Sequence, residues 1–217
     1  MPQRALRVDI SSAGLETGAL ILQRLRRDHP DIAVHQVEEG VPRGLARLAD
    51  GDLDVLLGLA TDRAAAAVCE PLRREPVLVG MAADHPLARC DVVPVSHLGG
   101  VELLLPSDEA APEWNGFVTA FCRQAGATPQ RWPGVTHGSV AAAEVLREGR
   151  CVVPTTAWWH PPTDIVFRPL LAPVPVFRWS MITTPAAAPR AEVQAFVRCA
   201  RAVGAERGWL AEGSEAA

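Results

Sequence analysis

In the N-terminal part of the chain, segments with the hydrophobic pattern of a strand alternate with segments that have the hydrophobic pattern of a helix. Residues 6–10 and 32–37 alternate between apolar and polar positions as strands do, and residues 53–59 form a mostly apolar run. The segments between them, 14–27 and 42–49, carry apolar residues three and four positions apart, which is typical of one face of a helix. The order strand, helix, strand, helix, strand predicts parallel strands joined by right-handed crossovers.

The same alternation continues to the C-terminal region. Further strands are predicted over 76–81, 101–105, 150–153, 164–167 and 176–183, and further helices over 113–124, 139–148 and 190–203. Pro189 and Gly204 are the expected boundaries of the last helix. The small and polar residues at the end of the chain predict a disordered tail over 206–217. The pattern as a whole predicts an α/β protein with two lobes.

The helix predicted over 14–27 has an apolar stripe wider than packing on one sheet requires. Its members are Leu15, Gly18, Ala19, Ile21, Leu22 and Leu25, with Leu20 standing off the stripe. We expect the additional apolar edge to cover a partner subunit.

Composition places the chain among folded proteins and limits its partners. Of 217 residues, 48% are hydrophobic and 21% charged, which excludes general disorder. No apolar run approaches the roughly 20 residues of a membrane-spanning helix, and no signal-peptide pattern follows the first residues, so we expect a cytoplasmic protein. The net charge is −4, and all 21 basic residues are arginines without a clustered basic stripe. This stretch of chain is therefore not expected to bind nucleic acid by itself.

Motifs for catalysis, cofactors or metals are not evident. Cys69, Cys90, Cys122, Cys151 and Cys199 are widely spaced and contain no C-x-x-C pair, which favours reduced, packed thiols over a disulfide framework or a zinc site. The six histidines include no pair at helical spacing. No phosphate-binding glycine loop or nucleophile elbow occurs. We therefore predict no catalytic residues, no cofactor and no metal.

Several sequence segments resemble, in the correct order, the effector-binding domain of LysR-type transcriptional regulators. These segments are RLRRDHPDIAV from Arg24, LARLADGDLDVLLG from Leu45, EPVLVGMAADHPLA from Glu75, VPVSHLGGVELLLP from Val93 and VAAAEVLREGRCVVP from Val140. The resemblance covers residues 6 to about 204. D-H-P-L-A and G-D-L-D together, at this spacing, carry most of its specificity.

The resemblance implies a periplasmic-binding-protein-like fold of type 2. Two Rossmann-like lobes would be joined by two crossover strands and would hold a small-molecule effector in the cleft between them. Lobe I would comprise residues 1–84 and 165–205, and lobe II residues 85–164. The function implied is the sensing and oligomerisation half of a DNA-binding transcriptional regulator. DNA would be bound only through an N-terminal winged helix-turn-helix, for which this chain has no room before its first strand. The chain is then a truncated regulator, which we favour, or a free-standing sensor.

The resemblance also implies a homodimer or tetramer. The helix over 14–27 would pair antiparallel with the partner's helix over 113–124. The expected apolar contacts are Leu15, Leu22, Phe117 and Phe121.

Effector-binding residues are expected in loops at the carboxyl ends of strands, where ligands bind in open α/β sheets. The candidates are Ser11, Ser12, Ala13, Pro106, Ser107, Thr136, His137, Gly138, Ser139, Pro154 and Thr155. As effector ligands they would supply hydroxyl and amide donors. As purely structural residues they would cap helices or form turns. Both interpretations remain open for each loop.

Two departures from the family pattern lie near the expected cleft. Arg150 and Cys151 stand where the family usually has an apolar strand, and Trp158-Trp159-His160-Pro161-Pro162 replaces a helical segment. The two tryptophans line an effector pocket or fill the core. These departures argue against the small carboxylate effector that is typical of the family, and the tryptophans favour an aromatic one. A carboxylate and an aromatic compound both stay candidates.

Two other functions are compatible with such a fold. A solute-binding module would feed a transporter but would need export. A small-molecule enzyme could also be built on the same two lobes, because the fold does not fix the function. Turnover of a bound compound would distinguish an enzyme from a sensor.

Overall fold

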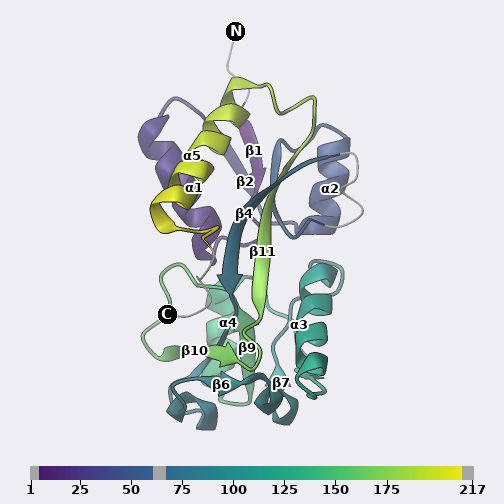
Figure 1. Cartoon of the computed structure of the whole chain (residues 1–217), viewed down its shortest axis with the longest axis vertical. Helices are drawn as coiled ribbons and strands as arrows, with labels where there is room; N and C mark the ends of the chain where they lie inside the picture. Colours follow the sequence, from purple (N-terminus) through teal and green to yellow (C-terminus); the bar gives the residue numbers. More distant parts are fainter. Residues whose placement is uncertain (1–4, 61–66, 212–217) are drawn as a thin grey trace. The chain divides into compact units, whose positions relative to one another are not determined.

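The computed structural model describes residues 5–60 and 67–211. Its contacts divide the chain into two compact units (Figure 1). Unit 1 comprises Met1–Glu75 and Arg178–Ala217, and unit 2 comprises Pro76–Phe177. The boundaries therefore differ from those expected at residues 84 and 165. Strands β5 (Leu78–Ala82) and β10 (Ile165–Leu171) were both expected in lobe I. They pair with each other inside the sheet of unit 2, and this pairing moves both boundaries.

Unit 1 is built on a five-stranded sheet of order β2-β1-β3-β11-β4. Its strands are β1 (Leu6–Asp9), β2 (Val34–Val37), β3 (Val55–Gly58), β11 (Val176–Thr183) and β4 (Val68–Pro76). As predicted, β1 lies parallel to both β2 and β3. The returning strand β11 is antiparallel to β3.

Helix α1 (Glu16–Asp28) packs against α5 (Ala191–Arg207) of the same chain. Leu20, which the apolar stripe left out, is only 7% exposed, and Leu22 is 2% exposed. Most of the apolar stripe of α1 is thus buried within the chain, in part by α5, whereas its members Leu15 and Ala19 remain half-buried. That a partner subunit covers this remaining edge stays a prediction.

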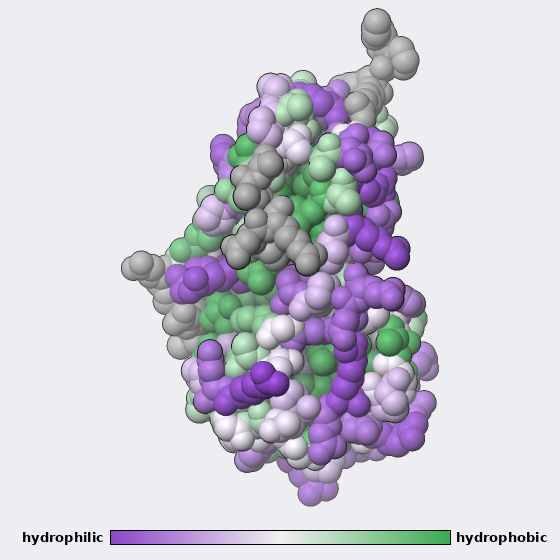
Figure 2. Space-filling view, turned by 90° about the vertical axis from the view of Figure 1, so that its right-hand side faces the viewer, coloured by the Kyte–Doolittle hydropathy of each residue, from purple (hydrophilic) through white to green (hydrophobic). Residues whose placement is uncertain are grey.

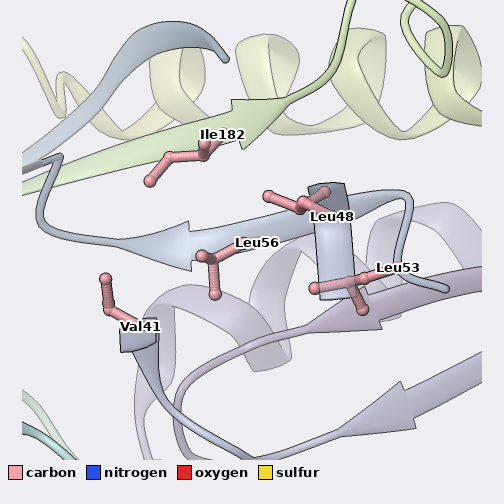
Figure 3. Close-up of a cluster of buried hydrophobic side chains, with 5 residues drawn as sticks. All are labelled: Val41, Leu48, Leu53, Leu56 and Ile182. Atoms are coloured by element: carbon pink, nitrogen blue, oxygen red, sulfur yellow. The ribbon is translucent and has the colours of Figure 1, made fainter. Parts of the chain in front are cut away.

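Helix α2 (Val41–Ala49) packs against the sheet of unit 1, and a small apolar cluster forms the contact (Figure 3). Val41 and Leu48 of α2 meet Leu56 of β3 and Ile182 of β11, with Leu53 beside them. The cluster joins residues from both chain segments of unit 1. Its burial links α2 to the central strands of the sheet.

The C-terminal helix is longer than the sequence pattern predicted. Gly204 lies inside α5, which ends at Gly208 in the left-handed conformation with φ of 65°. Trp209 follows and is buried, with the guanidinium of Arg73 lying 5.0 Å from its ring centroid. Residues 206–211 are therefore ordered parts of unit 1, contrary to the predicted tail. Residues 212–217 of that tail lie outside the described residues.

Unit 2 is built on a six-stranded sheet of order β6-β10-β5-β9-β7-β8. The strands not yet bounded are β6 (Val93–Pro94), β7 (Glu102–Leu103), β8 (Gln130–Arg131) and β9 (Cys151–Thr155). The short strand β7 lies parallel to both β8 and β9, whereas β5 is antiparallel to its two neighbours, β9 and β10. The carboxyl ends of β8, β7 and β9 thus meet at one edge of the sheet.

Helices and 3-10 turns complete unit 2. They are η2 (Pro86–Arg89), η3 (Val95–Gly100), α3 (Pro112–Gln124) and α4 (Gly138–Arg147). Helix α4 packs on β5 and β9, and α3 contacts η3. In the part of the chain that the structure describes, no helix is long and apolar enough to cross a membrane.

Candidate functional site

The loop after β1 carries the first group of expected effector residues. Ser11 has a positive φ of 65°, and its hydroxyl donates to the carbonyl oxygen of Leu57 in β3. The hydroxyl of Ser12 accepts a hydrogen bond from the amide of Gly14 at 3.3 Å, and Ala13 is exposed. Helix α1 begins after Leu15, which makes no side-chain cap. The two serines therefore stabilise the loop, and the expectation that they cap α1 was wrong.

A buried carboxylate, which the sequence analysis did not single out, lies under this loop. Asp9 is 0% exposed and accepts hydrogen bonds from the amides of Ser11 (2.8 Å) and Glu39 (3.0 Å). Burial raises the pKa of Asp9 despite these hydrogen bonds, which lower it. The carboxylate joins the loops that follow β1 and β2. The sequence signal, one acidic residue in an otherwise apolar strand end, was too weak to reveal it.

The loop after β7 is also held by internal contacts. The hydroxyl of Ser107 accepts from the amide of Ala110 at 3.2 Å, as a turn residue does. The carbonyl oxygen of Pro106 accepts from Asn115 Nδ2 at 2.9 Å and from the guanidinium of Arg131. The polar groups of this loop that make these contacts thus bind α3 and β8.

At the end of β9, the hydroxyl of Thr155 has hydrogen-bond partners, whereas the hydroxyl of Thr156 has none among the described residues. Thr155, 6% exposed, donates to the carbonyl oxygen of Thr156 (2.9 Å) and accepts from Trp158 Nε1 (2.8 Å). The indole of Trp158 is 9% exposed and packs edge-on against Phe167. Thr156 Oγ1 is buried and has no hydrogen-bond partner among the described residues. Trp158 therefore fills the core, whereas Trp159 is half-buried beside His160.

In the loop into α4, the polar residues expected at the site have no side-chain partner in the described part of the chain. Within the described residues, Thr136, His137 and Ser139 form no side-chain hydrogen bond or ion pair. His137 precedes the helix in an extended conformation and does not cap it, and Ser139 lies within the first turn, so it is not the cap that was considered. Gly138 has a φ of 78°, a conformation that favours glycine.

The first turn of α4 is both uncapped and without acidic residues. The amide groups of this turn therefore have no side-chain acceptor among the described residues, at the positive end of the helix dipole. Val135 and Val140 beside it are 48% and 77% exposed. The edge of unit 2 thus combines hydrogen-bond donors with exposed apolar surface. Groups of His, Cys, Asp and Glu that could hold a metal ion are not found among the described residues.

A family model described as the LysR substrate binding domain matches residues 1–205. This match covers nearly the whole chain. The chain belongs to the LysR substrate-binding domain family.

Curated relatives and solved structures agree with this assignment. The chain is 26% identical over 192 residues to the transcriptional dual regulator OxyR of Escherichia coli, covering 84% of this chain and 60% of the relative. It is 32% identical over 146 residues to the small neutral protease regulatory protein of Streptomyces coelicolor, covering 64% of this chain and 44% of that protein. The chain thus spans about 60% of the length of the first of these relatives.

Two solved structures have the same fold. Full-length BenM matches 99% of this chain and 72% of its own, with a TM-score of 0.77 and 18% identity. The reduced OxyR regulatory domain from Pseudomonas aeruginosa matches 91% of this chain and 97% of its own, with a TM-score of 0.74 and 21% identity. At these identities the likeness concerns the fold, which is the two-lobe α/β fold that the sequence analysis predicted.

In this LysR substrate-binding domain, two of the expected intersubunit contacts are buried inside the chain. Leu22 is 2% and Phe121 is 4% exposed, and Phe121 packs edge-on against Phe117. Phe117 also contacts Trp114 and Phe177, with ring centroids 5.8 and 5.6 Å away. Leu22 and Phe121 therefore stabilise their own units and are not free to contact a partner. Leu15 and Phe117 are half-buried.

Proposed function

We propose that this chain is the effector-sensing and oligomerisation part of a LysR-type transcriptional regulator. The observation that supports this most directly is the uncapped first turn of α4 with free Thr136, His137 and Ser139 beside it, in a chain whose family match spans residues 1–205. An effector that binds one conformation more tightly than another shifts the population toward it. Such a shift, relayed through subunit contacts, would control transcription.

The residues around the first turn of α4 indicate which class of compound the effector belongs to. Amide donors and hydroxyls at an uncapped helix N-terminus favour a hydrogen-bond acceptor such as a carboxylate. The exposed side chains of Val135 and Val140 favour an apolar body next to that acceptor. Ser11, Ser12, Ser107 and Thr155 have hydroxyls already engaged in internal hydrogen bonds. We therefore propose an aliphatic or aromatic carboxylate bound mainly by residues 136–140.

A thermal-shift series tests this function. A ligand that binds only the folded protein raises the melting temperature with its concentration. Small aliphatic and aromatic carboxylates should include a compound that does so, and Ser139→Ala should reduce its shift. Ser96→Ala, an exposed serine in η3, is the matched control and should leave the shift unchanged. A shift reduced equally by both variants, or no shift with any carboxylate, contradicts the proposal.

The buried cysteines of this chain do not favour peroxide sensing through thiols. Some relatives are described as hydrogen peroxide-inducible genes activators. In this chain, burial raises the pKa of both Cys122 and Cys151 to about 11, and it also raises the pKa of Cys199. The thiolate is the form that reacts with oxidants, so these three cysteines are poorly suited to that chemistry.

The proposed function includes DNA and a cellular location. One of the solved structures with this fold is full-length CbnR in complex with its target DNA. For this chain, we propose that a DNA-binding segment joined to it makes that contact, and that the protein works in the cytoplasm, where the chromosome lies. No observation favours an enzyme or a solute-binding module. Incubating a thermal-shift ligand with the protein and finding it chemically converted would favour the enzyme.

The oligomer is proposed on the family resemblance, with α1 of one copy against α3 of another. Because Leu22 and Phe121 are buried, residues on the outward sides of these helices must make the contact.

A further inference from the structure

A pocket of about 500 Å³ lies within unit 2 beside α3. Helix α3 supplies most of its lining, and strand β8 and the loop after β7 supply most of the rest. None of the effector residues expected from the sequence is found in the described lining, so the pocket is distinct from residues 136–140. A volume of this size is typical of a small-molecule site.

Small residues form part of the α3 wall of the pocket. Gly116 and Ala120 are both exposed, and a Cβ at Gly116 would meet no atom within 4 Å. Leu105 and Pro129 add apolar surface to the lining. Figure 2 views the molecule from the side on which Figure 1 draws α3, and hydrophilic residues lie among hydrophobic ones there. The pocket thus has open space next to α3, and a ligand in it would meet both polar and apolar groups.

The charged residues of the lining sum to a positive charge. They are Asp108, Arg123 and Arg131. Asn115 Nδ2 donates to Asp108 Oδ1 at 2.5 Å and Arg131 Nη1 donates to the same oxygen at 2.9 Å, and these hydrogen bonds lower the pKa of Asp108. Arg123, by contrast, is exposed and has no ion pair or side-chain hydrogen bond among the described residues. Within the described lining, the positive charge of Arg123 is therefore not compensated.

Hydrogen-bond donors in the lining are also left over. Arg131 is held by Asp108 and by the carbonyl oxygen of Pro106, which accept from its two Nη atoms. In the described part of the chain, its Nε–H has no acceptor. The hydroxyl of Thr119, one turn before Arg123 on α3, likewise has no hydrogen bond to a described residue. Free donors beside an uncompensated positive charge favour an anion.

We infer that this pocket binds a small anion through a carboxylate or phosphate group. Arg123 is the main ligand, because a guanidinium binds such groups through two parallel hydrogen bonds. A cation is not favoured, because Asp108, the one carboxylate of the described lining, is already bound by Asn115 and Arg131. The inference goes beyond the proposed function and does not depend on it, since the two sites share no residue.

A titration of the isotope-labelled full chain, followed by nuclear magnetic resonance, tests the inference with two probes, succinate and inorganic phosphate. Sedimentation first establishes a concentration at which the chain is monomeric, because the proposed contact between copies would also use the outward side of α3. At least one probe should shift the amide signals of Gly116 and Ala120 until they saturate, because both residues line the pocket. The probe that binds more tightly identifies the anion as a carboxylate or a phosphate.

Two variants with opposite expected effects identify the charges involved. Arg123→Gln should raise the dissociation constant of the probe about tenfold, because it removes a charged hydrogen bond from an exposed position without disturbing the fold. Asp108→Asn should lower the constant, because it removes the opposing charge and keeps an oxygen that accepts from Asn115 and Arg131.

Matched controls separate this pocket from binding elsewhere. Arg198→Gln, at an exposed position on α5, should leave the dissociation constant unchanged, and so should Ser139→Ala at the proposed effector site. Succinamide, the neutral analogue of succinate, should not shift the signals of Gly116 and Ala120. The inference is wrong if neither probe shifts these signals, if Arg123→Gln binds as the wild type does, or if Asp108→Asn binds more weakly.

Discussion

Asp54 has an unusually concentrated set of contacts for one residue. Its side chain is 2% exposed and accepts hydrogen bonds from Arg7 Nη2 at 2.8 Å and from Arg190 Nη1 at 2.5 Å. The amide of Arg7 adds a third hydrogen bond at 2.9 Å. Asp54 directly precedes β3. Its carboxylate thus links β3 to Arg7 of β1 and to Arg190, which precedes α5. It links the two chain segments of unit 1 by charge, as the apolar cluster around Leu56 links them by packing.

Replacing Asp54 is expected to destabilise the domain strongly. Asp54→Ala leaves two largely buried guanidinium groups without their shared partner, and losing one member of such a group destabilises a protein by about 3 kcal/mol or more. Asp52→Ala is a matched control, because Asp52 also lies near Arg7, at 3.6 Å, but is 70% exposed. Exposed pairs contribute less than about 1 kcal/mol. Urea unfolding measures both variants, and similar losses in the two would refute this account.

The contribution of Asp54 should also depend on pH. Burial by itself would raise the pKa of Asp54, but the hydrogen bonds from Arg7 and the charges of Arg190 and Arg7 outweigh it, so the pKa is lowered. A carboxyl whose pKa is lower in the folded state stabilises that state above its unfolded pKa of about 3.9, and this stabilisation is lost as the pH falls through the folded pKa.

The unfolding free energies of the wild type and Asp54→Asn should therefore differ most near neutral pH and converge in acid. Denaturant titrations between about pH 7 and pH 3 measure the difference. Asp28, Asp108 and Asp164 also have lowered pKa values, but they are present in both proteins and cancel. A difference that stays constant over this range would show that the charge of Asp54 is not what stabilises the fold.

At the residue scale the sequence located the loops but did not reveal how each side chain is used. Ser11, Ser12, Ser107 and Thr155 all lie at the carboxyl ends of strands, as expected, and all have hydroxyls engaged by nearby groups. Which hydroxyl is engaged depends on tertiary neighbours such as Leu57 and Trp158 that the local pattern does not contain. The free side chains of Thr136, His137 and Ser139 could likewise be recognised only once α4 was shown to lack a side-chain cap.

At the element scale, the glycine in α1 has a packing role. A Cβ at Gly18 would lie 2.8 Å from the Cβ of Ile10, closer than packed atoms allow, and Ile10 is 2% exposed. In α5, by contrast, a Cβ at Gly204 would have its nearest contact at 3.5 Å, with the ring of Trp209. Packing therefore requires a glycine at position 18 but not at position 204.

Alanine substitutions at these glycines are expected to have opposite effects. Gly18→Ala should destabilise the domain by about 1–3 kcal/mol through overpacking, more than the helix propensity that alanine adds. Gly204→Ala should stabilise it by up to about 1 kcal/mol, because the helix gains propensity without a clash. Urea unfolding of both variants measures the difference, and a stabilised Gly18→Ala would refute the packing role.

The elements located best are those with a regular apolar pattern in the sequence. The strand over 176–183 and the helix over 113–124 were located to within a residue. Strand β4 was not predicted because it lies at the edge of its sheet and most of its side chains are at least partly exposed, so its apolar residues do not alternate. The extension of α5 past Gly204 was missed for another reason: glycine often ends a helix, but here Gly204 lies inside α5 and Gly208 ends it.

At the scale of the whole molecule, the chain crosses between its units at residues 75–76 and 177–178. Unit 1 keeps the two crossing strands together near these points. Glu75 of β4 is 2% exposed and accepts from Trp179 Nε1 of β11 at 2.7 Å and from the hydroxyl of Thr17 in α1 at 3.1 Å. Arg73 pairs with the other oxygen of Glu75 at 3.2 Å. These contacts around Glu75 belong to unit 1.

This arrangement predicts that the two units differ in their ability to fold alone. Every strand pairing of the unit 2 sheet lies between residues 76 and 177, a single continuous segment. A fragment of residues 76–177 should therefore show native-like circular dichroism and a cooperative unfolding transition. A fragment of residues 1–75 lacks β11, which pairs with β3, and α5, which covers α1, so it should remain unfolded. An unfolded 76–177 fragment would mean that the second unit depends on the first for its stability, and the assignment of β5 and β10 to an independent sheet would then fail.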